Sequence, residues 1–353
     1  MHIKRNIKII ENQALADFLV QHNEPTFRLK QIQYWLFSKN VSEFSPMTNL
    51  SSKLRPILED NLQIIPRKDP SKFDRADGTI RYVSKLSDGT FTESVLMIAG
   101  DRITVCISSQ VGCSLNCKFC ATGYLPYKRN LYAGEIYEQV YVLNGIALSK
   151  YAKPVSNIVY MGMGEPLLNY KNLIDSINHI TSSEAGLGLS SKRITISTSG
   201  IAKIIERLAL DSPRSNLALS LHAACDSKRS QIMSINDSNS ISTLVESLNK
   251  YYSITKNLIT IEYILFNNFN YSLKDDKELL NICRKVPTKV NLLEYNPIDS
   301  FKSLSPASTN KIALFQKFLI DSNIITTVRY SKGRDIAAAC GQLAYKFADK
   351  STL

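Results

Sequence analysis

Three cysteines, Cys113, Cys117 and Cys120, stand within eight residues of the chain in the order CSLNCKFC. Such a short loop can wrap one compact metal centre. A cubane [4Fe–4S] cluster normally takes four thiolates, so three would leave one iron free to bind a small chelating molecule. The alternative is a zinc knuckle, which needs four Cys or His ligands. No histidine lies near the loop in sequence, and Cys106 stands in a strand-like run, so the open-iron cluster is the favoured interpretation.

A second group of residues suits ligand binding. The sequence MGMGEP at 161–166 follows a strand-like run, and its glycines let the backbone approach a ligand closely. Glu165 can accept hydrogen bonds from an ammonium group, although a tight turn between strand and helix would explain the same pattern. Further polar side chains end later strands, where caps and turns are the alternative.

The thiol of Cys340 lies 13 residues from the end of the sequence and is followed by Gly341. A glycine there indicates a sharply turned or mobile loop that can present the thiol to solvent. The alternative is a small core residue in a terminal helix. The residues alone favour that alternative.

The elements that must position these residues alternate along most of the chain. Strand-like runs occur at 104–108, 157–161, 193–197, 216–221, 259–266, 290–294 and 325–330. Helix-like segments lie between them, at 134–149, 170–182, 201–210, 241–252, 274–285 and 310–323. This alternation predicts a parallel sheet that is closed or partly closed as a barrel.

Unusual polar or glycine-rich clusters follow the ends of these strands, at 112–120, 162–166, 197–200, 220–222, 295–297 and 331–333. The carboxyl ends of parallel strands meet on one rim. We therefore expect the clusters to form a single site. Before the barrel, residues 1 to about 70 have helical periodicity, and the Asp-Gly pairs at 77–78 and 88–89 predict a hairpin of two strands, 79–86 and 90–98.

Composition limits the class of protein. The 353 residues are 44% hydrophobic and 21% charged, which allows a sizeable core and argues against global disorder. The net charge of +12 favours a polyanionic partner, although charge alone does not decide this. No apolar stretch approaches the roughly 20 residues of a membrane span, and the polar N-terminus lacks a signal-like core, so we expect a cytoplasmic protein without a membrane partner. Seven cysteines are too few for a disulfide scaffold.

The spacing CxxxCxxC, with Phe119 before the last cysteine, resembles the signature of the radical S-adenosylmethionine (SAM) superfamily. Further motifs resemble, in order, the RlmN/Cfr family of RNA adenine methyltransferases: VGC at 111–113, MGMGEPLLN at 161–169, STSG at 197–200, SLHA at 220–223, YNP at 295–297 and AACGQL at 338–343. The resemblance implies an α/β fold with a radical SAM partial (β/α)6 barrel at 99–335. It also implies a helical RNA-binding accessory domain at 1–70, a β-hairpin extension at 71–98 and a C-terminal loop or tail at 336–353.

The same resemblance implies the cofactors. A [4Fe–4S] cluster on Cys113, Cys117 and Cys120 would bind SAM at its open iron and release a 5′-deoxyadenosyl radical. Two molecules of SAM are used in each turnover. The implied SAM-binding residues are Gly164, Glu165, Ser197, Ser220, Leu221, His222 and Asn296.

The remaining roles also come from the resemblance. Cys340 would accept a methyl group by substitution, lose a hydrogen from it to the radical, and add the resulting carbon to the purine. Cys106 would resolve the adduct by forming a disulfide with Cys340, and Glu93 would accept the C2 proton. Without the resemblance, Glu93 is better explained as a surface carboxylate. Cys225 and Cys283 match no motif of the family and are interpreted as structural.

The resemblance also addresses the substrate. Pro166 and Ser199 follow the RlmN-type GMGEP and STSG, whereas Cfr-type enzymes that methylate C8 show GMGEA and STIG. We expect methylation of C2 of an adenine in the peptidyl transferase centre of 23S rRNA, and of the adenosine after the tRNA anticodon. Cfr-type C8 methylation and a non-catalytic metal-cluster RNA-binding protein are the alternatives. A monomer reduced by a donor such as flavodoxin or ferredoxin is implied.

Two details depart from the family pattern, Ser234 where proline is usual and Tyr295 where tryptophan is frequent. Both lie beside the predicted site and put its tuning in doubt rather than its chemistry. Basic residues outside the motifs are candidates for binding phosphates, although such charges usually form a solvated face. These candidates are Arg28, Lys30, Lys128 and Arg129.

Overall fold

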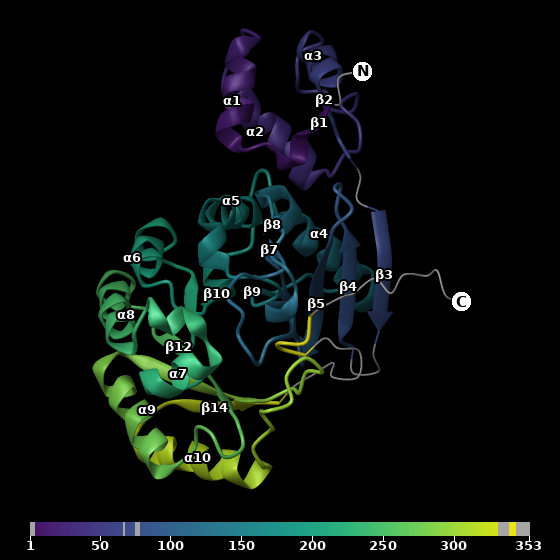
Figure 1. Cartoon of the computed structure of the whole chain (residues 1–353). Helices are drawn as coiled ribbons and strands as arrows, with labels where there is room; N and C mark the ends of the chain where they lie inside the picture. Colours follow the sequence, from purple (N-terminus) through teal and green to yellow (C-terminus); the bar gives the residue numbers. More distant parts are fainter. Residues whose placement is uncertain (1–3, 66–67, 75–77, 331–338, 344–353) are drawn as a thin grey trace.

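The computed structural model describes residues 4–65, 68–74, 78–330 and 339–343. The N-terminal helices stand together at one end of the molecule, at the top of Figure 1. They are α1 (Asn12–Gln21), α2 (Arg28–Gln33), the π-helical turn η2 (Tyr34–Ser38) and α3 (Leu54–Asn61). Two short parallel strands, β1 (Arg5–Asn6) and β2 (Leu62–Gln63), join the beginning and the end of this part.

One ten-stranded sheet forms the rest of the frame. Its order is β14-β13-β12-β11-β10-β9-β6-β5-β4-β3. The parallel strands are β6 (Arg102–Cys106), β9 (Asn157–Tyr160), β10 (Ile194–Thr198), β11 (Asn216–Ser220), β12 (Ile259–Leu265), β13 (Thr288–Glu294) and β14 (Thr326–Arg329). The antiparallel strands are β3 (Lys68–Asp74), β4 (Ile80–Lys85) and β5 (Phe91–Ala99).

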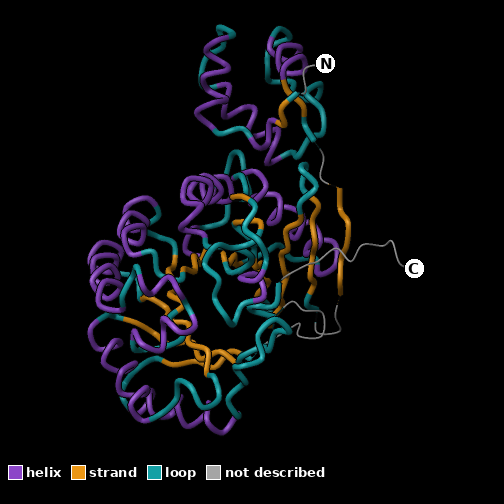
Figure 2. Tube along the Cα trace, viewed as in Figure 1, coloured by secondary structure: helices purple, strands orange, loops and turns teal. Residues whose placement is uncertain are grey.

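Helices connect the parallel strands and lie outside the curved sheet in Figure 2. They are α4 (Ala133–Tyr151), α5 (Tyr170–Thr181), α6 (Ala202–Asp211), α7 (Asp226–Ile232), α8 (Ile241–Thr255), α9 (Leu273–Lys285) and α10 (Thr309–Asp321). The chain thus runs through β6-α4, β9-α5, β10-α6, β11-α8, β12-α9 and β13-α10 before closing on β14. The predicted (β/α)6 partial barrel is confirmed.

Residue patterns explain these elements. Every residue of β12 is buried, because helices cover one face of the strand and the barrel interior covers the other. Helix α9 begins with a capping box, in which Ser272 and Asp275 satisfy each other's backbone N–H groups. No helix in the described part of the chain is long and apolar enough to span a membrane.

The segment before the barrel differs in part from the prediction. The expected hairpin at Asp88-Gly89 is present: Leu86 N–H donates to Thr90 O at 2.8 Å, and Gly89 has φ +82°. However, β3 adds a third antiparallel strand at the edge, so the extension is a three-stranded meander. The sequence did not suggest β3, because proline and lysine interrupt its alternation, whereas α3 lies within residues 1 to about 70, where helices were expected. Of the predicted tail at 336–353, only 339–343 lies within the described residues.

The N-terminal part packs on α4. Lys8 Nζ forms an ion pair with Glu138 at 2.7 Å, and Tyr137 Oη donates to Phe37 O at 2.7 Å. The backbone of α4 at Gly134 lies against the backbone at Lys8, and a Cβ added at position 134 would stand 2.0 Å from Lys8 O. A side chain at position 134 is therefore incompatible with this contact.

Gly134→Ala is expected to destabilise the protein by about 1–3 kcal/mol, because the new methyl group must push the N-terminal segment away from α4. Gly145→Ala in the same helix is the matched control, since an added Cβ there meets nothing within 4 Å. That control should be neutral or stabilising by up to about 1 kcal/mol, because alanine favours helix. Urea unfolding measures both. Equal stability of the two variants would contradict the contact.

Candidate active site

A cavity of about 350 Å³ opens where the parallel strands end. Most of the predicted site residues line it: Cys106, Cys113, Cys117, Cys120, Gly164, Glu165, Ser197, Ser220, His222, Asn296 and Cys340. Five of the six predicted loop clusters therefore contribute to one pocket, as expected, and the sixth, 331–333, lies outside the described residues.

The cysteine loop lies between β7 (Gln110–Val111) and the 3-10 helix η3 (Ala121–Tyr124). Burial, with smaller contributions from Cys120 and Glu165, raises the pKa of the Cys113 thiol to about 11. The pKa of Cys117 also lies well above its usual value, through burial and then through Cys120 and Cys113. The three thiols therefore lie close enough to interact electrostatically.

The donor set of the cysteine loop consists of three thiols, which suits a multi-iron centre. A tetrahedral zinc site needs four donors at roughly 2.0–2.3 Å from one centre, whereas a cubane cluster spreads its thiolates further apart. Three pocket-facing thiols with Glu165 and Asn296 in the same lining fit a cluster that leaves one iron for a small ligand.

Glu165 is held by fixed donors. Ser199 donates to Oε2 through its backbone N–H at 2.7 Å and its Oγ at 2.8 Å, and Leu167 N–H donates to Oε1 at 3.0 Å. Burial raises the pKa of Glu165, and these hydrogen bonds oppose that rise. Gly164 is required beside it, because φ is +93° and an added Cβ would stand 2.4 Å from Gln110 Cβ. A carboxylate that is desolvated and fixed in this way can accept hydrogen bonds from an ammonium group.

The ends of β10 and β11 present hydroxyl groups and one imidazole. Ser197 Oγ and Ser220 Oγ lie 3.4 Å apart. His222 has φ +55°, and its Nδ1 accepts a hydrogen bond from Ile264 N–H at 3.1 Å, which places the ring proton on Nε2. Burial, followed by the charge of Arg229, lowers the pKa of His222 to about 3, so the ring is a neutral donor.

A buried arginine ties these strand ends together. Arg229 has no exposed surface, and its guanidinium donates to the carbonyls of Leu221, Ser220 and Ser199 and to Asn236 Oδ1. Burial lowers the pKa of Arg229 to about 10, which leaves it charged at neutral pH. Nothing in the residue pattern around Arg229 indicated this role.

The segment 339–343 docks on the cysteine loop. Ala121 N–H donates to Gly341 O at 2.7 Å, and Thr122 Oγ1 donates to Leu343 O at 2.6 Å. Two hydrogen bonds therefore place residues 339–343 beside the loop that carries the three thiols.

Cys340 lies in this segment and is exposed toward the pocket, and Asn296 Nδ2 donates to its carbonyl at 3.2 Å. Lost hydration raises the pKa of Cys340 to about 11, with Cys120 and Glu262 adding to the rise. Burial raises the pKa of Cys106 to about 12, and Cys340 contributes to that shift. Both thiols are free here.

Two predicted residues are not in the lining. Leu221 is buried in the main core, and its carbonyl serves Arg229. Glu93 is fully buried and pairs with Arg81, Oε2 to Nε at 2.5 Å. It stands two residues before Val95, which does line the pocket, so it lies on the same face of β5. Its role as proton acceptor stays a prediction.

Several charged residues of the lining were not predicted. Two of them are Glu262 in β12 and Arg329 at the end of β14. A glutamate within a fully buried strand was a usable signal, because a buried carboxylate needs a partner. Arg329 carried no comparable signal, since a basic residue at a strand end is common on surfaces.

The unusual residues Ser234 and Tyr295 have clear positions. Ser234 Oγ donates to Leu115 O at 3.1 Å and so supports the cysteine loop. Tyr295 is buried and packs its ring edge against Phe266, with centroids 5.0 Å apart. Both lie beside the site, as expected.

The candidate phosphate contacts divide into two kinds. Arg129 donates to both oxygens of Glu135 at 2.7 and 2.9 Å and pairs with Asp88 at 2.6 Å. Arg28 donates to Gln31 Oε1 at 2.8 Å. These internal bonds favour structural roles for the two arginines. Two lysines are exposed, and their contact with RNA stays a prediction: Lys30 and Lys128.

Comparisons with known proteins agree with this geometry. The sequence model of the Ribosomal RNA large subunit methyltransferase N-terminal domain matches residues 5–64, and that of the Radical SAM superfamily matches 107–280. The crystal structure of a radical SAM methyltransferase from Sphaerobacter thermophilus has a TM-score of 0.85 and 35% identity, over 96% of this chain and 98% of that one. Fold and site together define a radical SAM enzyme.

Curated relatives are more specific. The probable dual-specificity RNA methyltransferase RlmN of Cytophaga hutchinsonii is 48% identical over 97% of this chain and 93% of its own length. The protein of the same name from Thermotoga petrophila is 41% identical over 97% of this chain and 98% of its own length. The chain belongs to the RlmN family of radical SAM RNA methyltransferases. The resemblance stated from the motifs is thereby confirmed.

The raised pKa of Cys340 predicts its reactivity in the cluster-free protein. Because only the thiolate is nucleophilic, alkylation by iodoacetamide should accelerate about tenfold for each pH unit and level off near pH 11. Thr122→Val removes the bond to Leu343 and should speed labelling at pH 8 several-fold, because a loosened segment is better hydrated. Peptide mass spectrometry of the 340 peptide gives the rates. The exposed Thr48→Val is the control, and a rate for Thr122→Val equal to it would contradict the docking.

Proposed function

We propose that this chain methylates C2 of adenine in 23S rRNA and in tRNA, with Cys340 carrying the methyl carbon. The observation that supports this most directly is the docking of segment 339–343 on the cysteine loop, which brings the Cys340 thiol into the same pocket as the three predicted cluster ligands. A cysteine that only filled the core would not face that cavity.

Cofactor binding is assigned to residues of the lining. We propose that Cys113, Cys117 and Cys120 hold a [4Fe–4S] cluster, and that SAM is used twice in each turnover. When bound, cluster and SAM supply a radical that removes hydrogen from a methyl group. Glu165 is placed to accept hydrogen bonds from the amino group of SAM, because its carboxylate is desolvated and fixed. The remaining SAM contacts are assigned to Gly164, Ser197, Ser220, Leu221, His222 and Asn296, with Leu221 acting through its backbone.

Two thiols of the chain, those of Cys340 and Cys106, form the covalent bonds of the proposed reaction. Cys340 Sγ, as a thiolate, accepts a methyl group by substitution. After the methyl carbon has bonded to the purine, Cys106 Sγ attacks Cys340 Sγ as a thiolate: the S–S bond forms while the S–C bond breaks, and the carbon leaves with the electron pair and takes up a proton. A thiol reductant must then reduce the Cys106–Cys340 disulfide before the next turnover. The contribution of Cys340 to the raised pKa of Cys106 supports their proximity. Glu93, on the pocket-facing side of β5, is the proposed acceptor of the C2 proton.

The assignment of C2 over C8 rests on Pro166 and Ser199. The Ser199 hydroxyl donates to Glu165 at 2.8 Å, a bond that the isoleucine of STIG could not make. Ser199, at which the STSG and STIG patterns differ, therefore has a direct role in the pocket. This supports the assignment of RlmN-type chemistry.

The partners follow from the family. The names of the relatives specify dual RNA specificity, and the net charge of +12 suits such substrates. We propose that tRNA is methylated as well as 23S rRNA. A monomer in the cytoplasm, reduced by flavodoxin or ferredoxin, completes the proposal.

Mass spectrometry of nucleosides tests the reaction. A strain that lacks its own enzyme should regain 2-methyladenosine in rRNA and tRNA when it expresses this chain, and 8-methyladenosine alone would refute the proposal. Cys340→Ala should abolish product, because no other thiol can carry the methyl carbon. Cys225→Ala, which changes a thiol outside the pocket lining, is the control and should retain product.

Cys106→Ala should trap a covalent protein–RNA species, because the adduct at Cys340 then lacks its resolving thiol. Denaturing gels with labelled RNA would show a slow band that is absent from the double variant Cys106→Ala/Cys340→Ala. Free product at the normal rate from Cys106→Ala would contradict the assigned role.

A further inference from the structure

The pocket contains a buried carboxylate that the proposed chemistry does not use. Glu262 lies in the middle of β12, is 4% exposed and lines the cavity. Its Oε1 accepts a hydrogen bond from Asn291 Nδ2 at 3.0 Å. Its Oε2 is buried and has no hydrogen-bond partner among the described residues. Arg329 Nη1 is 4.0 Å from Oε1, beyond hydrogen-bonding distance, and its side chain is 44% exposed.

A buried carboxylate oxygen without a hydrogen bond indicates that a bound molecule supplies the donor. Native proteins rarely leave a buried acceptor unsatisfied, because no new hydrogen bond then compensates for the loss of its hydration. Within the described chain, other buried carboxylate oxygens without a partner belong to Asp276 and Glu278, which do not line this cavity. Glu262 thus combines an unsatisfied charged acceptor with a position facing the space where ligands enter.

The position of Glu262 indicates which ligand supplies the donor. Glu262 raises the pKa of Cys340, and Arg329 acts on the thiols of Cys340 and Cys106. Glu165, by contrast, raises the pKa values of Cys113 and Cys117. Glu262 therefore lies in the part of the lining near Cys340, where the target base must enter, and the sheet register places it next to Ser220 of β11.

We propose that Glu262 Oε2 accepts a hydrogen bond from the 6-amino group of the target adenine and so selects adenine over other purines. This inference rests on the proposed function, because the base must enter the pocket beside Cys340. Adenine offers an N–H donor at position 6, whereas guanine offers a carbonyl oxygen that the carboxylate would repel. Purine without a 6-substituent would leave Oε2 unsatisfied.

The test compares RNA hairpins that differ only at the target nucleotide: adenosine, purine riboside or guanosine. Binding to cluster-loaded protein is measured by fluorescence anisotropy. The unaltered protein should prefer adenosine over purine riboside by roughly tenfold or more, as expected for a hydrogen bond to a charged group. Glu262→Met, which keeps the volume but removes the acceptor, should reduce this preference to within about twofold, and Glu262→Gln should retain part of it.

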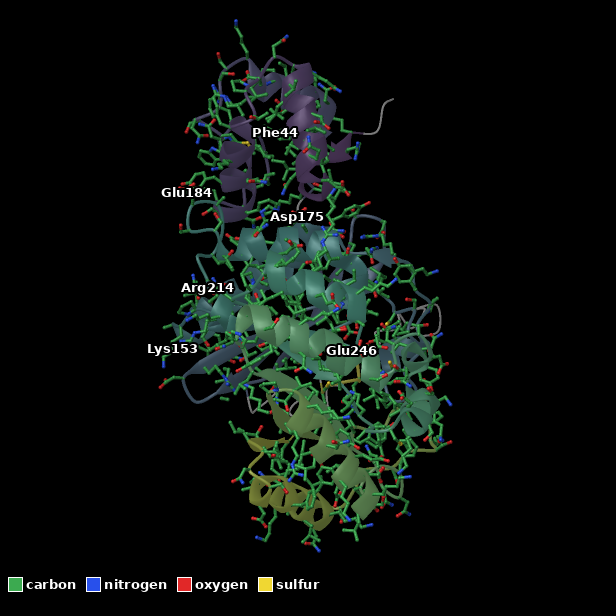
Figure 3. The ribbon with its side chains drawn as sticks, turned by 90° about the vertical axis from the view of Figure 1, so that its left-hand side faces the viewer. Phe44, Lys153, Asp175, Glu184, Arg214 and Glu246 are labelled. Atoms are coloured by element: carbon green, nitrogen blue, oxygen red, sulfur yellow. The ribbon has the colours of Figure 1, made fainter. Side chains whose placement is uncertain are left out.

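Glu246→Gln is the matched control, since Glu246 lies on the outer surface of α8 (Figure 3) and should keep the full preference. Iron content and thermal unfolding verify that each variant is folded and loaded. An unchanged adenosine preference in Glu262→Met would overturn the proposal. Loss of S-adenosylhomocysteine affinity with the RNA preference intact would also overturn it, because the donor would then belong to the cofactor. Absence of 2-methyladenosine in the strain assay would instead refute the proposed function alone.

Discussion

Two hydrogen bonds join parts of the chain that are more than 200 residues apart in sequence, and the site depends on them. Ala121 and Thr122, directly after the cysteine loop, donate to the carbonyls of Gly341 and Leu343. These bonds hold residues 339–343 against the cysteine loop, and so keep Cys340 in the lining of the pocket. Burial then sets the chemistry of the whole cavity, because it raises the pKa of the thiols and of Glu165 by the same cause.

Much of the fold could be predicted because the barrel repeats one pattern. Alternating strand-like and helix-like segments fix the order of a parallel sheet, and the rule that sites form at carboxyl ends places the loops together. The cysteine spacing and the Gly164-Glu165 pair were recognisable because local backbone demands specify their residue types. Strand β3 was missed, since it is stabilised by pairing at the edge of the sheet, which no local pattern reveals.

The rest of the site could not be predicted because it depends on contacts across the fold. The proximity of Cys106 to Cys340 was expected only from the family resemblance, and the hydrogen bonds of Arg229 form only because the ends of β10 and β11 are neighbours in the sheet. The same limit explains Arg129, a basic residue in a loop that two carboxylates turn into a structural group. The sequence shows that a residue is charged, but only the folded structure shows whether that charge pairs with another side chain or remains available to a ligand.

The guanidinium of Arg229 has a consequence for how the pocket holds a ligand. One planar group with fixed donor directions spans the ends of two neighbouring strands, through Ser199 on one side and Ser220 on the other. Ser199 in turn grips Glu165. A small shift at the end of β11 is therefore transmitted to that carboxylate, so the positions of Ser220 and Glu165 in the pocket are coupled.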